Sequence, residues 1–285
     1  MAQNDPWTIL KILTWTREYL TSKGVENARL EAEWMLCAVC GLDRVGLYLN
    51  FDRPLAETEL TGYRGMVSRR GKREPLQHIL GSQEFCGLDF YVTADVLIPR
   101  HDTEVLVAEA LKRAPDATAV LDMGTGSGCI AVALKKQLPQ AAMTATDISS
   151  AALAIAARNA ERHGARIEFL QGSLFSPLAG RCFDLVVSNP PYIPTKDIPL
   201  LQPEVRDFDP LTALDGGTDG LDCYRALIPA APEYLTPLGW LIVEVGIDQA
   251  GEVAEFFISA GNYVKPVVID DSNCIGRVVA AQKRH

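Results

Sequence analysis

Residues 120–128 read VLDMGTGSG, and this stretch decides the fold of the larger part of the chain. An apolar run ends in an acidic residue, and glycines at every second position then lead into another apolar segment. Glycine adopts backbone angles that other residues avoid, and it lets a ligand approach the main chain closely. Exposed N–H groups at the start of a following helix favour an anionic group, either a phosphate or a carboxylate. The pattern predicts a strand, a ligand-binding turn and a helix.

The spacing of the glycines separates two kinds of ligand-binding turn. A dinucleotide-binding turn has the pattern G-x-G-x-x-G. Here Gly124, Gly126 and Gly128 give G-x-G-x-G, preceded by Asp122, which resembles motif I of the Rossmann-like methyltransferases that hold S-adenosylmethionine. Asp147 ends the next predicted strand, about twenty residues further on, where a carboxylate can accept hydrogen bonds from both ribose hydroxyls. The alternative is a purely structural turn with Asp147 as a helix cap.

Strands and helices alternate from Thr118 to the end of the chain. Strands are expected over residues 119–123, 141–145, 167–170, 183–188, 240–245, 264–269 and 277–281. Helices are expected from the glycine turn to residue 138 and over residues 102–113, 149–163, 223–234 and 249–260. This alternation predicts an α/β domain with a mostly parallel, seven-stranded sheet that is covered on both faces.

The N-terminal part has a different pattern. Apolar residues such as Ile9, Ile12 and Leu20 recur at helical spacing, and strand-like alternation is missing. Aromatic residues around Gly87 indicate a hairpin. We therefore expect a small helical bundle over residues 1–82, a hairpin linker over 83–98 and the α/β domain over 99–285.

Asn189-Pro190-Pro191-Tyr192 directly follows the strand expected over residues 183–188. Two prolines end strand pairing and fix the backbone, so the turn is rigid. The side-chain oxygen of Asn189 and the carbonyl of Pro190 can accept hydrogen bonds from a substrate NH2 group, and Tyr192 can stack on a planar group. In open α/β sheets ligands bind at the carboxyl ends of strands. The turn therefore predicts a clamp for an amide or exocyclic amine, the alternative being a turn that only ends a strand.

Such a nitrogen is a poor nucleophile because its lone pair is delocalised. Hydrogen bonds that favour the developing positive charge would stabilise the transition state. Positioning beside a sulfonium methyl would supply most of the remaining acceleration. The expected reaction therefore needs no strong base.

Together these motifs resemble the protein-(glutamine-N5) methyltransferases that modify peptide chain release factors, the PrmC (HemK) family. The resemblance covers nearly the whole chain and extends to Leu97–Glu104, Glu204–Arg206, Pro210–Leu214, Gly220–Asp222 and Arg277–Val279. It implies a Rossmann-like class I methyltransferase domain that methylates, from S-adenosylmethionine, the glutamine of the Gly-Gly-Gln loop of class 1 release factors. The helical domain would dock that partner, the enzyme would be a monomer, and no direct nucleic-acid contact would be required.

The resemblance also implies roles for individual residues. The cofactor would be held by Gly124, Thr125, Gly126, Ser127, Gly128, Asp147 and Asn189. The substrate would be held by Asn189, Pro190, Pro191 and Tyr192, and the catalytic residues would be Asn189, Pro190 and Tyr192. Where the family often has an acidic residue after the third strand, this chain has Ser173, which predicts weaker binding of the cofactor.

Charge and composition limit the alternatives. Asp and Glu number 36 against 27 Lys and Arg, a net charge of −9, which disfavours tight binding to bare nucleic acid. The alternatives are a ribosomal-protein glutamine methyltransferase, a nucleic-acid adenine or guanine N-methyltransferase, and a cofactor-binding regulator without catalysis. The basic run from Arg64 to Arg73 either contacts a partner or RNA or forms a solvated helix end.

Cysteine usage and hydropathy suggest where the protein works. Seven scattered cysteines fit a reducing compartment. With no signal peptide and no membrane-spanning run expected, this favours a cytoplasmic location. We interpret Cys37 and Cys40 as buried helix residues and not as half of a zinc or redox site, and we expect no metal site.

Overall fold

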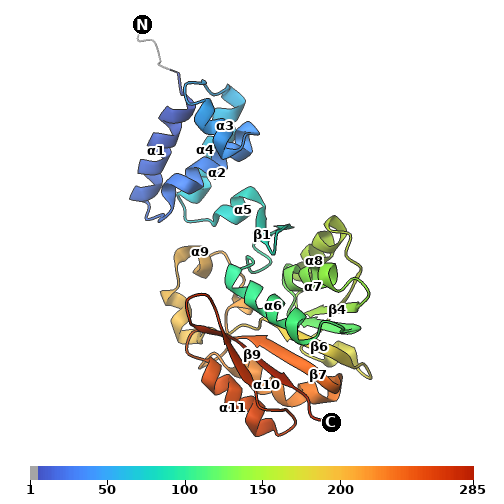
Figure 1. Ribbon diagram of the computed structural model, residues 1–285. Helices are drawn as coiled ribbons and strands as arrows, with labels where there is room; N and C mark the ends of the chain where they lie inside the picture. The colour runs from blue at the N-terminus through green and yellow to red at the C-terminus, as the bar shows by residue number, and fades with distance from the viewer. Residues whose placement is uncertain (1–5) are drawn as a thin grey trace. The chain divides into compact units, whose positions relative to one another are not determined.

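The computed structural model describes residues 6–285 and divides into two compact units (Figure 1). The first comprises the chain up to Gly81 together with Gln202–Phe208, and the second comprises Ser82–Leu201 and Asp209–His285. The hairpin thus groups with the second unit, and a short segment from the second half of the chain groups with the first. Within residues 6–285, no helix has the length and apolar character needed to cross a membrane.

The first unit is a bundle of helices, as its apolar periodicity predicts. The helices are α1 (Ile9–Ser22), α2 (Ala28–Cys40), α3 (Arg44–Leu49), α4 (Glu57–Arg70), α5 (Leu76–Leu80) and α9 (Pro203–Arg206). The side chain of Thr8 caps α1, and Gly41 ends α2 in the left-handed conformation with a φ of 63°. Leu20, Met35 and Tyr63 are among the buried residues of its core.

Cys37 and Cys40 lie half-buried on α2 and pack against this core. Burial raises the pKa of the Cys40 thiol to about 11, so the thiol is protonated at neutral pH. Among the residues that the structure describes, no group of His, Cys, Asp and Glu side chains could hold a metal ion.

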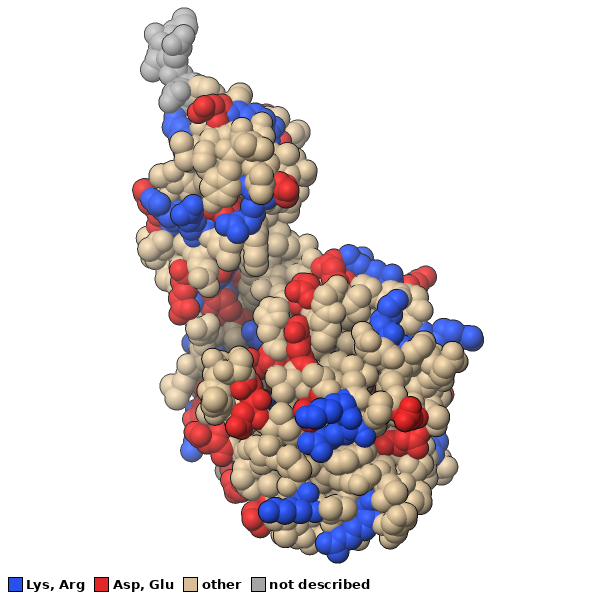
Figure 2. All heavy atoms as spheres, in the orientation of Figure 1, with Lys and Arg blue, Asp and Glu red and all other residues tan. Residues whose placement is uncertain are grey.

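The basic run contributes to an ion-pair network inside the first unit. Arg70 is only 4% exposed and pairs with both Glu31 and Glu204, the latter at 2.9 Å. Arg73 binds the other oxygen of Glu204 at 2.6 Å. Arg70, the last residue of α4, and Arg73, which follows it, therefore join this end of α4 to α9, whereas Arg64, Arg69 and Lys72 of the run are exposed. On the face drawn in Figure 2, basic and acidic side chains are interspersed over the described residues.

The second unit contains the seven-stranded sheet, with strand order β5-β4-β3-β6-β7-β9-β8. The strands are β3 (Ala119–Met123), β4 (Ala142–Asp147), β5 (Ile167–Gln171), β6 (Phe183–Ser188), β7 (Leu235–Glu244), β8 (Val267–Asp270) and β9 (Gly276–Gln282), and β1 (Ser82–Phe85) and β2 (Leu88–Tyr91) form the separate hairpin. All pairings from β5 through to β7 are parallel, and only β9 runs antiparallel to its neighbours β7 and β8. The predicted Rossmann-like fold is confirmed.

Helices cover both faces of this sheet. They are α6 (Glu104–Arg113), α7 (Cys129–Gln137), α8 (Ser150–Arg162), α10 (Asp222–Ala230) and α11 (Ala250–Ala260). Along β6, Leu185 and Val187 pack into the layer of α6 and α7, whereas Val186 packs into the layer of α10 and α11. The alternation of side chains along a strand thus supplies two apolar cores from one sheet.

The order of the strands places a crevice at one edge of the sheet. From β3 the chain passes to β4 on one side and later returns to β6 on the other side of β3. Met123, the last residue of β3, lies opposite Ser188, the last residue of β6. In open α/β sheets such a switch point is where ligands bind.

Replacing Glu204 with alanine should destabilise the first unit by about 3 kcal/mol, because it leaves the buried Arg70 and the nearby Arg73 without their shared carboxylate. Burial alone would raise the pKa of Glu204, but hydrogen bonds from Arg73 and Arg70 outweigh it and lower the pKa below 4.5. The stabilisation is therefore present above that pH and declines as the pH falls further.

Urea unfolding at neutral and acidic pH measures this loss. Asp207→Ala is the control, because Asp207 makes an exposed pair with its neighbour Arg206, and it should have a much smaller effect. Equal losses in the two variants would refute the structural role of Glu204.

Candidate active site

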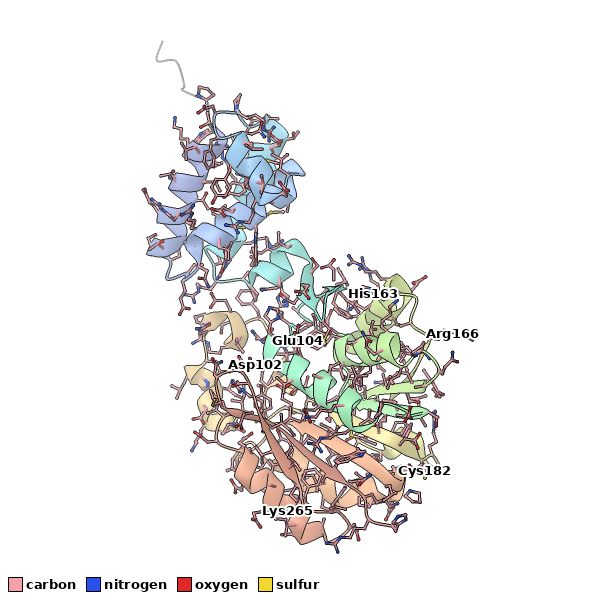
Figure 3. All side chains as sticks on the ribbon, in the orientation of Figure 1. Asp102, Glu104, His163, Arg166, Cys182 and Lys265 are labelled. Carbon is pink, nitrogen blue, oxygen red and sulfur yellow. The ribbon has the colours of Figure 1, made fainter. Side chains whose placement is uncertain are left out.

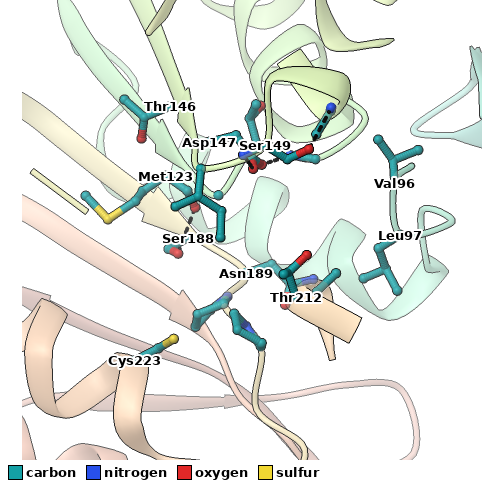
Figure 4. A pocket seen from close by; sticks show the side chains of 18 of the residues that line it. Val96, Leu97, Met123, Thr146, Asp147, Ser149, Ser188, Asn189, Thr212 and Cys223 are labelled. Atoms are coloured by element: carbon teal, nitrogen blue, oxygen red, sulfur yellow. Dashed lines mark hydrogen bonds between the residues drawn. The ribbon is translucent and has the colours of Figure 1, made fainter. Parts of the chain in front are cut away.

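A cavity of about 360 Å³ opens where β3, β4 and β6 end (Figure 4). Of the residues expected at the site, those that line it are Gly124, Thr125, Gly126, Ser127, Asp147, Asn189, Pro190 and Pro191. The remaining two, Gly128 and Tyr192, are not among its lining residues. The structure thus brings the two sequence motifs to one cavity, although they are more than sixty residues apart in the chain.

The glycine turn leaves space for a ligand beside its backbone. Gly124 and Gly126 have φ values of 72° and 54°, and a Cβ atom built on either would meet nothing within 4 Å. Both residues line the cavity, so the missing side chains leave room for a ligand. The amides of Gly124 and Thr125, however, donate to the carbonyl of Thr146 at 2.8 and 2.9 Å. These two amides, which precede the start of α7, are therefore engaged within the protein.

Gly128 packs two helices together. It caps α7 with a φ of 80°, and a Cβ at this position would lie 3.0 Å from the Cβ of Ala156 on α8. Only glycine permits this close approach at a left-handed backbone position. Gly128 therefore allows α7 and α8 to pack closely, and it is not itself a lining residue of the cavity.

Asp122 links the strand, the turn and the helix. It is fully buried, and its Oδ2 accepts hydrogen bonds from the Thr125 hydroxyl at 2.6 Å and the Ala131 amide at 3.1 Å. Burial raises the pKa of Asp122 to about 7, with a further contribution from the charge of Asp147. Asp122 thereby fixes the path of the chain from β3 into α7.

Asp147 faces the cavity from the end of β4 (Figure 4). Its Oδ2 accepts from the Gly126 amide and its Oδ1 from the Ser149 amide, both at 2.9 Å. Each oxygen of a carboxylate has a second lone pair, so both can still accept from neighbouring hydroxyls of a ligand. The side chain that caps α8 is that of Ser149, not that of Asp147.

The side-chain amide of Asn189 has a defined orientation. Its Nδ2 donates to the hydroxyl of the buried Thr103 at 3.2 Å, and the structure shows no hydrogen bond to its Oδ1 among the described residues. The Ser188 hydroxyl donates to the Met123 carbonyl at 2.8 Å, which holds the ends of β6 and β3 together. The site thus presents an amide oxygen that can accept from a ligand N–H group.

Tyr192, which the sequence predicts to stack on the substrate, packs beside the cavity and is not one of its lining residues. Its ring packs against the apolar layer of α10 and α11, and its hydroxyl donates to Oε1 of Glu244 at 3.3 Å. Its backbone carbonyl accepts from the side chain of Gln249 at 2.9 Å. These contacts anchor the end of the turn to β7 and α11.

A segment before α6 supplies lining residues to which the sequence motifs assign no role. They include Val96, Leu97, Arg100 and Thr103. The Arg100 guanidinium pairs at 2.9 Å with Asp209, whose side chain is fully buried, and Pro210 and Thr212 beyond it also line the cavity. Burial raises the pKa of Asp209 to about 6, although Arg100 opposes the shift. The signals in the sequence were the similarities of Leu97–Glu104 and Pro210–Leu214 to segments of the family.

Comparisons with known proteins agree with this geometry. A family model described as "PrmC N-terminal domain" matches residues 11–81, and one described as "Methyltransferase small domain" matches residues 101–200. The chain is 63% identical over 276 residues to a release factor glutamine methyltransferase of Geobacter sulfurreducens, covering 97% of both chains. It is 44% identical over 269 residues to one of Moorella thermoacetica, covering 93% of this chain and 95% of that one.

Solved structures share the fold at low identity. The hMettl16 catalytic domain has a TM-score of 0.57 at 16% identity and covers 76% of this chain and 81% of that chain. A methyltransferase of Pyrococcus furiosus has a TM-score of 0.53 at 19% identity and covers 70% of this chain and 90% of that one.

Gly128→Ala should lower the free energy of unfolding by roughly 2–4 kcal/mol, from backbone strain and the overlap with Ala156. Gly126→Ala is the matched control: it carries the same kind of strain without a contact and should cost about 1–2 kcal/mol. Urea unfolding without ligand measures both. Equal losses would show that the contact with Ala156 does not require a glycine.

Proposed function

We propose that this chain, which belongs to the release factor glutamine methyltransferases, modifies the glutamine of the Gly-Gly-Gln loop of class 1 release factors. It is an S-adenosylmethionine-dependent protein-glutamine methyltransferase. The product would be glutamine methylated on its side-chain nitrogen. The choice of substrate is carried by the 63% identity to a release factor glutamine methyltransferase, and the orientation of Asn189, whose amide nitrogen binds Thr103, supports the clamp.

The cavity has the features that S-adenosylmethionine needs. The space above Gly124 and Gly126 admits a ligand against the backbone, and Asp147 has acceptor capacity for the two ribose hydroxyls. We assign cofactor contacts to the predicted residues that line the cavity, whereas Gly128 supports the turn from outside. When bound, the cofactor supplies a methyl group on a sulfonium, which is a good leaving group.

The Asn-Pro-Pro-Tyr turn would hold the substrate glutamine. Asn189 Oδ1 and the Pro190 carbonyl would accept hydrogen bonds from its NH2 group. These acceptors favour the positive charge that develops on the nitrogen in the transition state, and the rigid turn aims the lone pair. The methylated nitrogen is then strongly acidic and loses its proton to water. Pro191 would line the cavity beside the substrate, and Tyr192 would anchor the turn through Glu244.

The partner would be recognised beyond the glutamine itself. We assign docking of the release factor to the first unit, as the division of the chain and the match of residues 11–81 support. The net charge of −9 and the interspersed charges of Figure 2 favour a protein partner over nucleic acid. A monomeric, cytoplasmic enzyme remains part of the proposal.

Mass spectrometry of a purified class 1 release factor, incubated with this protein and S-adenosylmethionine, should show one added methyl group on the Gly-Gly-Gln peptide. Asn189→Ala should abolish most of this transfer, roughly 100-fold or more, because it removes an acceptor aimed at the reacting nitrogen. Its binding of the cofactor, measured by calorimetry, should weaken far less than the transfer does, because Asp147 and the glycine turn keep their contacts.

Two results would count against the assignment. Full activity of Asn189→Ala would show that Asn189 does not hold the substrate. Cofactor binding without methylation of the release factor would favour a ribosomal-protein glutamine substrate first and a nucleic-acid base second.

Ser173 also lines the cavity, next to Gly172, whose amide donates to the backbone carbonyl of Asp147 at 3.0 Å. Ser173→Asp should tighten the binding of S-adenosylmethionine by roughly 3- to 10-fold, because a carboxylate is the stronger acceptor for the adenine amino group. Ser176→Asp adds the same charge outside the lining residues and serves as the control. Equal affinity of wild type and Ser173→Asp would contradict this role.

A further inference from the structure

Arg100 is the only cationic side chain among the described residues that line the cavity. The other charged residues of the lining are Asp95, Asp147 and Asp222. Arg100 directly precedes the short helix η1 (His101–Thr103), and its side chain is 42% exposed. The side chain thus borders both the cavity and the solvent, where a protein substrate would enter.

The turn that carries Arg100 is held from two directions. The Thr103 amide donates to the Arg100 carbonyl at 3.1 Å, and the Thr103 hydroxyl accepts from Nδ2 of Asn189 at 3.2 Å. Asp102, which Figure 3 labels at the start of α6, pairs with Arg277 of β9 at 3.1 Å. Arg100 therefore belongs to the turn that also holds Asn189, on the side of the proposed substrate clamp.

Asp209 holds one end of the Arg100 guanidinium. Its Oδ2 accepts from Nη2 of Arg100 at 2.9 Å, and its side chain is fully buried. Its Oδ1 is also buried and has no hydrogen-bond partner in the part of the chain that the structure describes. A buried carboxylate with a single partner contributes little stability, and well-packed apolar residues can often replace such a pair without loss. Stability alone therefore does not account for the pair.

Most N–H groups of Arg100 remain available to a ligand. A guanidinium carries N–H groups on all three of its nitrogens, and among the described residues only Nη2 has a hydrogen-bond partner. The other lining side chain with N–H groups is Asn189, and its Nδ2 already binds Thr103. Within the described lining, Arg100 is thus the side chain with N–H donors to spare.

The proposed substrate loop needs a donor of this kind. The two glycines of a Gly-Gly-Gln sequence have no side chains, so an enzyme contacts them through main-chain N–H and C=O groups. The clamp itself consists of two acceptors, Asn189 Oδ1 and the Pro190 carbonyl, which suit an NH2 group and cannot bind a carbonyl oxygen. A guanidinium is a planar, forked donor that binds oxygen atoms with a defined geometry. Arg100 therefore complements the clamp.

We propose that Arg100 binds main-chain carbonyl oxygens of the Gly-Gly-Gln loop, with Asp209 as the positioning residue that orients its guanidinium. This role rests on the proposed function and extends it from the glutamine to the backbone that carries the glutamine. The rival ligand is the carboxylate of S-adenosylmethionine. The substrate is favoured because Thr103, which binds Asn189, shares a turn with Arg100, and because Asp209 already offsets the charge that would attract a carboxylate.

Arg100→Met removes the donors and keeps much of the length of the side chain. In steady-state methylation by the full-length enzyme, it should raise the KM for the release factor by roughly 10- to 100-fold, because charge-assisted hydrogen bonds are lost. The affinity for S-adenosylmethionine should be nearly unchanged. Arg162→Met is the matched control and should leave KM as in wild type: Arg162 is 46% exposed and pairs with Asp89, and neither residue lines the cavity.

A double variant separates substrate binding from the stability of the ion pair. Arg100→Met leaves Asp209 buried without a partner, so it should also lower the free energy of unfolding in urea. Combining it with Asp209→Asn removes the buried charge and should recover part of this stability, while the KM for the release factor stays high. Recovery of KM together with stability would overturn the proposal, as would an unchanged KM in Arg100→Met.

The affinity for the cofactor, measured by calorimetry, decides between the two ligands of Arg100. Weaker binding of S-adenosylmethionine by Arg100→Met, at an unchanged KM for the release factor, would assign Arg100 to the carboxylate of the cofactor and overturn the proposal. If the wild type does not methylate the Gly-Gly-Gln peptide, the proposed function fails and the role of Arg100 fails with it. An active wild type beside an Arg100→Met variant of normal KM refutes the role of Arg100 alone.

Discussion

Parallel pairing of β3 with β6 is the constraint on which the active site depends. Because Met123 lies opposite Ser188, the glycine turn and the Asn-Pro-Pro-Tyr turn leave the sheet at the same level. A slip of one residue would displace Asn189 by about 3.3 Å and turn its side chain to the other face of the sheet. The register of backbone hydrogen bonds thus sets the separation between the groups that would hold the cofactor and those that would hold the substrate.

Local sequence patterns were sufficient to predict the elements that carry the site. The boundaries of β3 and β6 agree with the predicted ranges 119–123 and 183–188, because each strand is an apolar run that ends at a glycine or a proline turn. Helical periodicity likewise predicted the bundle of the first unit. The limits differ where breaker residues lie inside a strand: β7 begins at Leu235, before the expected residue 240, and contains Pro237 and Gly239.

The roles of individual side chains depend on distant contacts that no local pattern contains. Gly128 belongs to the glycine motif, but Ala156 on another helix determines its role. Tyr192 belongs to the Asn-Pro-Pro-Tyr motif, but its hydroxyl binds Glu244, fifty-two residues further on. The basic run contains Arg70, whose partner Glu204 lies 134 residues away. Charge clustering in the sequence could not reveal that pair.

The short segment Gln202–Phe208 makes both units discontinuous in the sequence. The chain passes from one unit to the other at three places, after residues 81, 201 and 208, and not once, as a simple linear arrangement would require. A gene fragment that ends at residue 81 therefore encodes an incomplete first unit, and the remaining fragment carries a displaced piece of it. Such a division would separate Arg70 and Arg73 from Glu204, so the fragment would lose the carboxylate that the two arginines share.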